Sequence, residues 1–165
     1  MKLYALLAVL PAALAVPDTI SFKRLEPAPF APATAEQGAF ARCEGEDHHR
    51  ANLAHPADML DCLEISSWAT ANNGMWVLKA TSTSTDTTTD DAGPDEHGWH
   101  ALYGYGNCAL FVKYTEPTSV GNADVVKLIE TIHMSDGMRL GPVEEVGSFC
   151  GCQAGVDVKF WLRGP

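Results

Sequence analysis

The sequence predicts an α+β fold, in which a small antiparallel sheet of about four strands carries two helices on one face and is stabilised by disulfide bonds. Three observations predict it: two segments with apolar residues at helical spacing, four segments with strand-like patterns, and five cysteines in a chain of 165 residues. The segments follow one another as helix, strand, strand, helix, strand, strand. Two successive units of one helix and one hairpin naturally give an antiparallel sheet with both helices on the same face.

The first helix is expected over residues 56–68. Pro56 suits a first-turn position, and Met59 and Leu63 belong to an apolar stripe with spacings of three to four residues. Cys62 lies near this stripe. The segment should therefore pack its apolar side on the sheet, with the cysteine close to the core.

The second helix is expected to begin near Asn122, a good N-cap residue, with Asp124 close to the positive end of the helix dipole. Val125 and Ile129 recur at helical spacing, and Gly137 supplies a stop signal. These local signals predict an amphipathic helix with clear ends.

Four strands are expected, over residues 74–79, 102–114, 138–146 and 156–162. Within the second, the run Ala109–Val112 is continuously apolar, as in a strand that is buried on both faces or nearly so. Gly104 and Gly106 are candidate positions for a bend in this strand.

The last strand alternates between apolar and polar residues. Val158 and Phe160 fall on one face, while Lys159 and Trp161 fall on the other. This alternation is typical of a sheet covered on one face only. Trp161 on the outer face is either a partial cover over the sheet or part of a contact surface.

Residues 1–15, MKLYALLAVLPAALA, have the pattern of a secretory signal peptide. They contain one basic residue, an apolar run too short to span a bilayer, and an Ala-x-Ala cleavage site formed by Ala13 and Ala15. We therefore expect a secreted, extracellular protein whose cysteines meet an oxidising environment. Nothing later in the sequence is apolar for long enough to span a membrane.

Residues 16–40 are rich in Pro, Ala and polar residues, without a sustained period, and are expected to form a flexible leader. The dibasic pair Lys23-Arg24 is either a cleavage site that removes a pro-segment or a solvated pair. Residues 41–165 are enough for a single domain and too few for two.

A long polar stretch, residues 80–98, separates the first two expected strands. It is either a disordered hairpin insertion or a tract of acceptors for O-linked sugars, with the Ser and Thr residues of 81–89 as the acceptors. The net charge of -10 argues against binding to nucleic acid and to anionic membrane surfaces, because both favour a basic face.

The cysteines are an odd set: Cys43, Cys62, Cys108, Cys150 and Cys152. In a secreted protein we expect two disulfides and one unpaired thiol, and the spacing does not fix the connectivity. Cys150 and Cys152 lie two residues apart, so on an extended segment both point to the same face, and a bond between them would be strained. We expect these two cysteines to have different fates.

Two groups of histidines and acids are the best candidates for a site. Asp47, His48, His49 and His55 form one group, and Asp95, Glu96, His97 and His100 form the other. Imidazole and carboxylate groups are ligands for zinc or copper, but both groups fall in expected loops, so we expect solvated side chains and no metal site.

Catalytic motifs are missing from the sequence, which lacks a Gly-x-Ser-x-Gly elbow, a phosphate-binding glycine loop and a His-Glu-x-x-His helix. The paired acids Asp90-Asp91, Asp95-Glu96 and Glu144-Glu145 are expected to be solvated. The sequence does not indicate the aromatic-lined cleft that a glycosidase needs. We expect no enzyme, no catalytic residues and no cofactor.

The cysteine contexts and the element order resemble a known family. The segments that carry the resemblance are YGNCALFV at 105–112, GNADVVKLIETI at 121–132, DCLEI at 61–65, Trp76, and a late cysteine before a final apolar strand. Over roughly Cys43 to Leu162 they resemble the secreted effectors of fungal pathogens that are described as necrosis-inducing factors. The resemblance implies four framework cysteines, matching Cys43, Cys62, Cys108 and one of Cys150 and Cys152.

The resemblance implies a secreted, non-enzymatic effector that promotes death of plant cells. The alternative is a toxin against competing microbes, because some killer toxins are also compact, cysteine-stapled sandwiches of helices and a sheet. In either case the partner is expected to be a protein or cell surface of a host or a microbe, with no nucleic acid and no membrane span.

Overall fold

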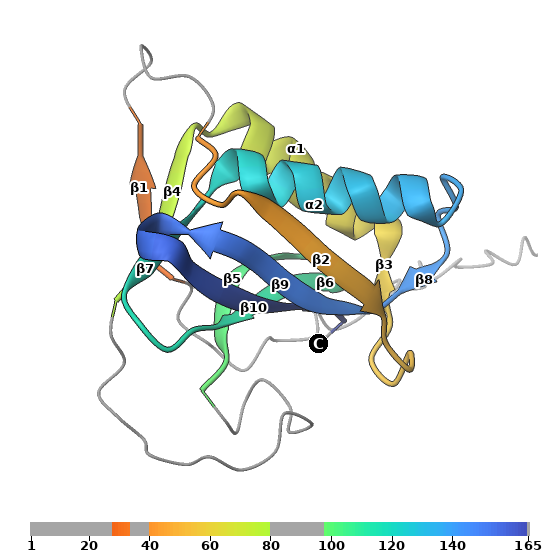
Figure 1. The fold of residues 1–165 in the computed structure, drawn as a ribbon. Coiled ribbons are helices and arrows are strands. Elements are labelled where there is room, and N and C mark those ends of the chain that lie inside the picture. The colour runs from red at the N-terminus through yellow and green to blue at the C-terminus, as the bar shows by residue number, and fades with distance from the viewer. Residues whose placement is uncertain (1–27, 34–39, 80–97, 165) are drawn as a thin grey trace, which may run out of the picture.

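The computed structural model describes residues 28–33, 40–79 and 98–164. At its centre is a five-stranded antiparallel sheet with the strand order β2-β9-β10-β6-β5. In that order the strands are Gly45–Arg50, Glu145–Cys152, Val156–Arg163, Cys108–Lys113 and His100–Tyr105. Helices α1 (Met59–Ala71) and α2 (Asn122–Ser135) lie side by side on one face of this sheet (Figure 1). The expected α+β arrangement, with two helices on one face, is confirmed.

Two smaller sheets flank the central one. Strands β1 (Phe30–Pro32), β4 (Gly74–Leu78) and β7 (Thr118–Gly121) form an antiparallel sheet in the order β1-β4-β7. Strands β3 (Ala57–Asp58) and β8 (Pro142–Val143) pair at the start of α1, and a short 3₁₀ turn, η1 (Gln153–Gly155), connects β9 to β10. The expectation of about four strands was therefore too low.

The ends of α1 differ from the expected 56–68. Because Ala57 and Asp58 pair with β8, the helix begins only at Met59. The Asp58 side chain then caps the helix by accepting a hydrogen bond of 2.9 Å from the Leu60 amide. The helix continues to Ala71. Helix α2 begins at Asn122, close to the expected start, but its N-cap residue is Gly121 and not Asn122.

The segment 102–114, expected as one bent strand, is a hairpin of β5 and β6. The chain reverses at Gly106, whose φ of +51° suits glycine. A Cβ at this position would also meet the Asp61 carboxyl group of α1 at 2.5 Å. The glycines that suggested a bend therefore mark a reversal of the chain next to a helix.

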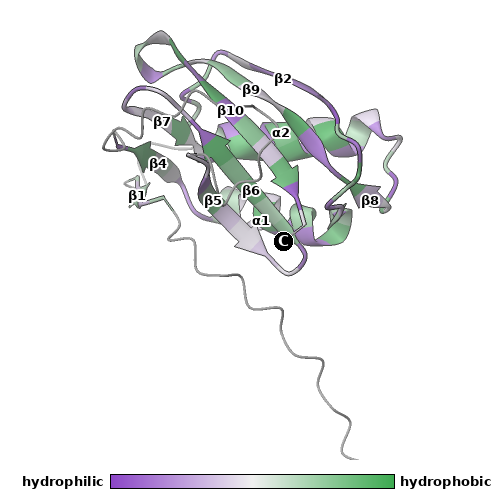
Figure 2. Ribbon diagram, turned by 90° about the horizontal axis from the view of Figure 1, so that it is seen from below, coloured by the Kyte–Doolittle hydropathy of each residue, from purple (hydrophilic) through white to green (hydrophobic). Residues whose placement is uncertain are grey.

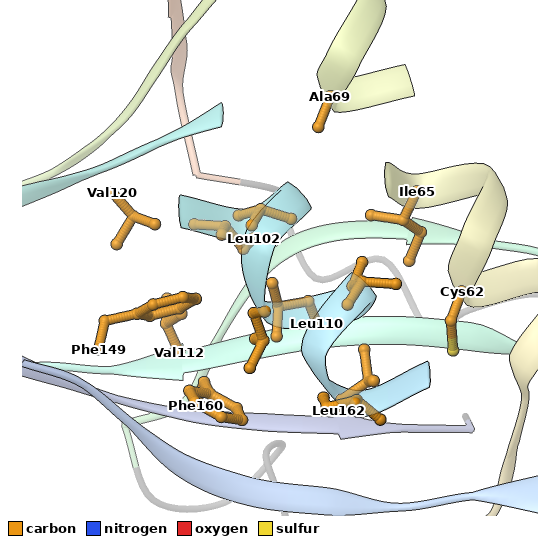
Figure 3. Close-up of a cluster of buried hydrophobic side chains, with 14 of the residues drawn as sticks. Cys62, Ile65, Ala69, Leu102, Leu110, Val112, Val120, Phe149, Phe160 and Leu162 are labelled. Atoms are coloured by element: carbon orange, nitrogen blue, oxygen red, sulfur yellow. The ribbon is translucent and has the colours of Figure 1, made fainter. Parts of the chain in front are cut away.

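The main core fills the space between the central sheet and the two helices (Figure 3). The sheet contributes Leu110, Val112, Phe160 and Leu162, and α1 contributes Ile65; all five side chains are completely buried. Each such side chain contributes roughly 1.5–3 kcal/mol through the hydrophobic effect. The continuous apolar run of β6 is buried on both faces, as expected, because a second apolar group lies on the other face of the sheet.

Among the described residues, no helix is both long and apolar enough to cross a membrane.

Candidate functional site

The face of the central sheet that points away from the helices carries its own apolar group. Trp99, Ala109 and Phe111 are buried there, and Ala101 and Trp161 pack against them. Figure 2 looks onto this face, with the sheet in front of the helices. Trp161 thus lies on the outer face, as the alternation in the sequence predicted.

Beside this group lies a hollow of about 750 Å³ that is open to solvent, which we call the sheet hollow. It is formed by β2, β9 and β10, by the loop that follows β2, and by Trp99 just before β5. Its lining includes Asp47, His49, Asn52, Trp99, Lys159 and Trp161. Aromatic and polar side chains therefore converge on one concave site.

Trp161 is held in a fixed orientation at this hollow. Its indole Nε1–H donates a hydrogen bond of 3.0 Å to Oε1 of Glu144. The Trp99 ring meets it edge-on, with 5.8 Å between ring centroids, and the Arg163 guanidinium lies 5.1 Å from the Trp161 ring centroid. Such contacts stabilise one orientation of an aromatic ring, in addition to the stabilisation that comes from burial of its apolar surface.

Glu144 connects this tryptophan to the loop at the rim. The side chain is only 1% exposed, and its second oxygen accepts a hydrogen bond of 2.9 Å from the backbone amide of His55. Its backbone carbonyl accepts a bond of 2.8 Å from the Ala51 amide. Both ends of the 51–55 loop are therefore anchored to one residue, which shapes this side of the sheet hollow.

The formal charges that line the hollow cancel. Asp47 and Glu144 contribute two negative charges, and Arg50 and Lys159 contribute two positive ones. Arg50 also forms an ion pair with Asp136 at 3.2 Å, near the end of α2. The site is therefore locally neutral in a chain whose formal charge is -10.

A second polar centre lies at the start of α2, where Asp124 holds the segment before β2. Its carboxylate accepts hydrogen bonds from the backbone amides of Gly121 and Arg42, both at 2.8 Å, and of Cys43 at 3.4 Å. Burial raises the pKa of Asp124, although these hydrogen bonds oppose the shift. The role of this carboxylate is structural, because backbone amides of this chain surround it.

The histidine-rich group of the sequence lies mostly on a strand. Asp47, His48 and His49 belong to β2, so the expectation of a loop was wrong for them. Neighbouring residues on a strand point to opposite faces, which separates His48 from His49. His55 does lie in the loop after β2.

In the second group, Asp95, Glu96 and His97 fall outside the described residues. The expectation of a solvated loop was wrong for His100, which is half-buried in β5 beside the Tyr114 ring, and burial lowers its pKa. Within the described part of the chain, no three His, Cys, Asp or Glu side chains gather in a way that could hold a metal ion.

The structure pairs Cys43 with Cys152 and Cys62 with Cys108, and it leaves Cys150 as a free thiol. The first bond ties the segment before β2 to the end of β9, and the second ties α1 to β6. Both bonds therefore connect parts of the chain that are far apart in sequence.

Cys150 and Cys152 do not share a face, contrary to the expectation for an extended segment. Gly151 between them has a φ of +57°, which interrupts the alternation of side chains. Cys152 is consequently 1% exposed, while Cys150 is partly exposed. Burial, followed by the nearby carboxylates of Asp157, Asp47 and Glu46, raises the pKa of the Cys150 thiol.

The adjacent acids Glu144 and Glu145 were expected to be solvated, which is wrong. Both are buried: Glu144 is bonded to the 51–55 loop, and Glu145 lies at the start of β9 near Asp136 at the end of α2. Burial raises the pKa of Glu145, and electrostatic interactions with His48, Arg50 and His49 oppose the shift. The sequence around these adjacent acids gives no signal that they are buried. The sheet hollow was not predicted either, because its lining comes from segments that are far apart in the sequence.

The predicted signal peptide 1–15, the pair Lys23-Arg24 and the Ser/Thr tract 81–89 lie outside the described residues. Of the expected leader 16–40, residues 28–33 and 40 are described, and three of them form β1.

Two comparisons with known proteins bear on identity. A search of curated proteins found no match to the chain. The profile of the Hce2 family, described as "Pathogen effector; putative necrosis-inducing factor", matches residues 42–150. The match includes Cys43, Cys62 and Cys108, while the fourth bonded cysteine, Cys152, lies just beyond it. Because the matched residues are more than half of the chain, the protein belongs to the Hce2 family of pathogen effectors.

Proposed function

We propose that this protein is a secreted, non-enzymatic effector of a fungus that acts on plant host tissue and induces necrosis. The observation that carries the proposal is the family match over residues 42–150, which spans α1, α2 and most of the central sheet. The fold alone would not indicate this function, because similar architectures serve unrelated roles.

Secretion is supported by two independent features. Residues 1–15 have the charge, apolar run and Ala-x-Ala ending of a signal peptide. The two disulfides are bonds that form and persist in oxidising compartments. Together they favour an extracellular protein that acts outside the producing cell.

A non-enzymatic mode of action is supported by how the polar groups are used. Both side-chain oxygens of Glu144 accept hydrogen bonds from groups of the same chain. Asp124 accepts three backbone hydrogen bonds in the same way. The buried carboxylates of Glu144 and Asp124 therefore stabilise the fold. We propose that activity comes from recognition of a partner by this stable scaffold.

Leaf infiltration of the purified protein tests this proposal. Residues 16–165, produced with both disulfides formed, should cause a lesion within the infiltrated zone, and buffer alone should not. The same preparation, reduced and alkylated, serves as the matched control of identical composition. The absence of a lesion from the oxidised, folded protein would count against a necrosis-inducing role.

The second candidate function is that of a toxin against competing microbes. The observation that favours it is the compact sandwich of two helices on an antiparallel sheet with two disulfides. Inhibition of fungal growth by the folded protein, without any leaf lesion, would favour this function over the first.

A further inference from the structure

We infer that the sheet hollow is a binding site for an uncharged oligosaccharide. The ligand class is a short chain of neutral pyranose sugars, such as those of plant or fungal cell walls. Neither the family match nor the proposed function assigns a ligand to this surface. The inference goes beyond the proposed function, since sugar binding does not require that the protein cause a lesion.

The first argument is the aromatic group at the hollow. Pyranose rings present flat faces of C–H groups, which pack well on aromatic rings, while their hydroxyls stay exposed at the edge. Trp99 and Trp161 both line the hollow, and the indole of Trp161 is fixed by its hydrogen bond to Glu144 and by the Arg163 guanidinium. A ring that is already fixed loses little conformational entropy when a ligand packs on it.

The second argument is the set of polar groups around these rings. Carboxylate, amide, hydroxyl and ammonium groups are supplied by Asp47, Asn52, Ser148 and Lys159. This mixture of donors and acceptors suits sugar hydroxyls, each of which both donates and accepts hydrogen bonds. A purely apolar ligand would displace water from these groups without replacing the hydrogen bonds of that water, and it would bind with lower affinity.

The third argument is charge. The two carboxylates and two cations of the lining cancel, so the site favours neither a polyanion nor a polycation. The formal charge of the whole chain, -10, further disfavours acidic polysaccharides and nucleic acids. A neutral ligand with many hydroxyls fits both observations.

The size of the hollow agrees with a ligand of a few sugar units. Its volume of about 750 Å³ lies within the usual range for small-molecule sites. The fixed elements β2, β9 and β10 form its floor, so the site exists before a ligand arrives.

Isothermal titration calorimetry of the folded protein with three soluble hexasaccharides tests the inference. The probes are the β-1,4-linked glucose, β-1,3-linked glucose and β-1,4-linked N-acetylglucosamine hexamers, which separate plant-wall from fungal-wall sources. We expect at least one to bind at ligand concentrations up to about 1 mM. Trp161→Ala should weaken that binding by about tenfold or more, because it removes the aromatic platform.

Asp47→Ala is the second variant, which keeps the test decisive if Trp161→Ala does not fold. Asp47 is exposed on β2, and its replacement should weaken binding without affecting the core. His48→Ala is the matched control, because His48 is the next residue of β2, does not line the hollow, and points to the other face.

Two results would overturn the inference. One is the absence of binding by all three hexasaccharides. The other is binding that both hollow variants leave unchanged, or that His48→Ala weakens as much as Asp47→Ala. Leaf lesions without sugar binding would leave the proposed function intact, whereas sugar binding without lesions would leave only this inference standing.

Discussion

Replacing Asp124 by Ala should strongly destabilise the protein. The substitution leaves three backbone amides without their acceptor: those of Gly121 and Arg42, bonded at 2.8 Å, and that of Cys43 at 3.4 Å. Hydrogen bonds to a charged group contribute about 1.5–3 kcal/mol each to stability. The substitution also removes the desolvation penalty of the buried carboxylate, which offsets part of this loss. Taken together, the two short bonds give an expected loss of about 2–4 kcal/mol, a large fraction of the stability of a single domain.

Urea unfolding followed by circular dichroism measures this loss. With a typical urea dependence for a small domain, the midpoint should fall by about 1–2 M. Asp136→Ala is the matched control, since it is the same substitution at the other end of α2. Asp136 forms an ion pair with the half-exposed Arg50, which should contribute less than about 1 kcal/mol. Equal effects of the two substitutions would refute the structural role given to Asp124.

The pH dependence of a third variant, Asp124→Asn, tests the same reasoning by its sign. Because burial raises the folded-state pKa of Asp124, the folded state binds the proton more tightly than the unfolded state. The stability linked to this group is therefore full below the unfolded pKa and is lost as the pH rises through the folded pKa. The free energy of unfolding of the wild type should therefore exceed that of Asp124→Asn by more at acidic pH than at pH 7. A smaller difference in the free energy of unfolding at acidic pH would show that folding lowers the pKa of Asp124 instead.

Three further predictions concern the cysteines, the loop at the sheet hollow, and processing. Cys150→Ser should leave the melting temperature nearly unchanged, because Cys150 is a free thiol. Cys62→Ser should lower the melting temperature strongly, because it breaks a disulfide and a disulfide typically contributes about 2–4 kcal/mol. Mass spectrometry of the wild type should find one free thiol, and five free thiols would contradict the pairing. Glu144→Ala should destabilise the fold by about 2–4 kcal/mol, because the Trp161 indole and the His55 backbone amide lose their acceptor. The same substitution should shift the Trp161 indole resonance in ¹H–¹⁵N spectra, and an unchanged resonance would contradict the contact with Glu144. Secreted protein should begin at Val16, and N-terminal sequencing that finds Met1 would refute cleavage, while a start after Arg24 would indicate dibasic processing.

The elements that local sequence signals determine were predictable. The position of α2 and the apolar run of β6 follow from hydrophobic patterns that act within a few residues, although the N-cap of α2 is Gly121 and not Asn122. By contrast, β2 has the sequence GEDHHR, and it forms a strand because it pairs with β9 and rests against α2. Tertiary pairing overrides local preference at such an edge strand, so its sequence looks like a loop.

The candidate site was largely beyond sequence reasoning. Trp161 was correctly placed on the outer face, since alternation along β10 is a local pattern. The burial of Glu144 depends on the backbone amide of His55 and the indole of Trp161, which meet it only in the folded chain. The different environments of Cys150 and Cys152 depend on the positive φ of Gly151, a backbone detail that residue spacing does not reveal.

We propose that activity requires the disulfide-bonded scaffold and no ionisable catalytic group. Leaf infiltration of three proteins at equal concentration tests this proposal. Cys108→Ser breaks the bond to Cys62 and leaves a hydroxyl in a buried strand, so it should cause no lesion. The wild type and the double variant His97→Ala/His100→Ala should cause lesions of similar size. If the double histidine variant melts like the wild type yet causes no lesion, activity depends on a site that uses these histidines and not on the scaffold alone.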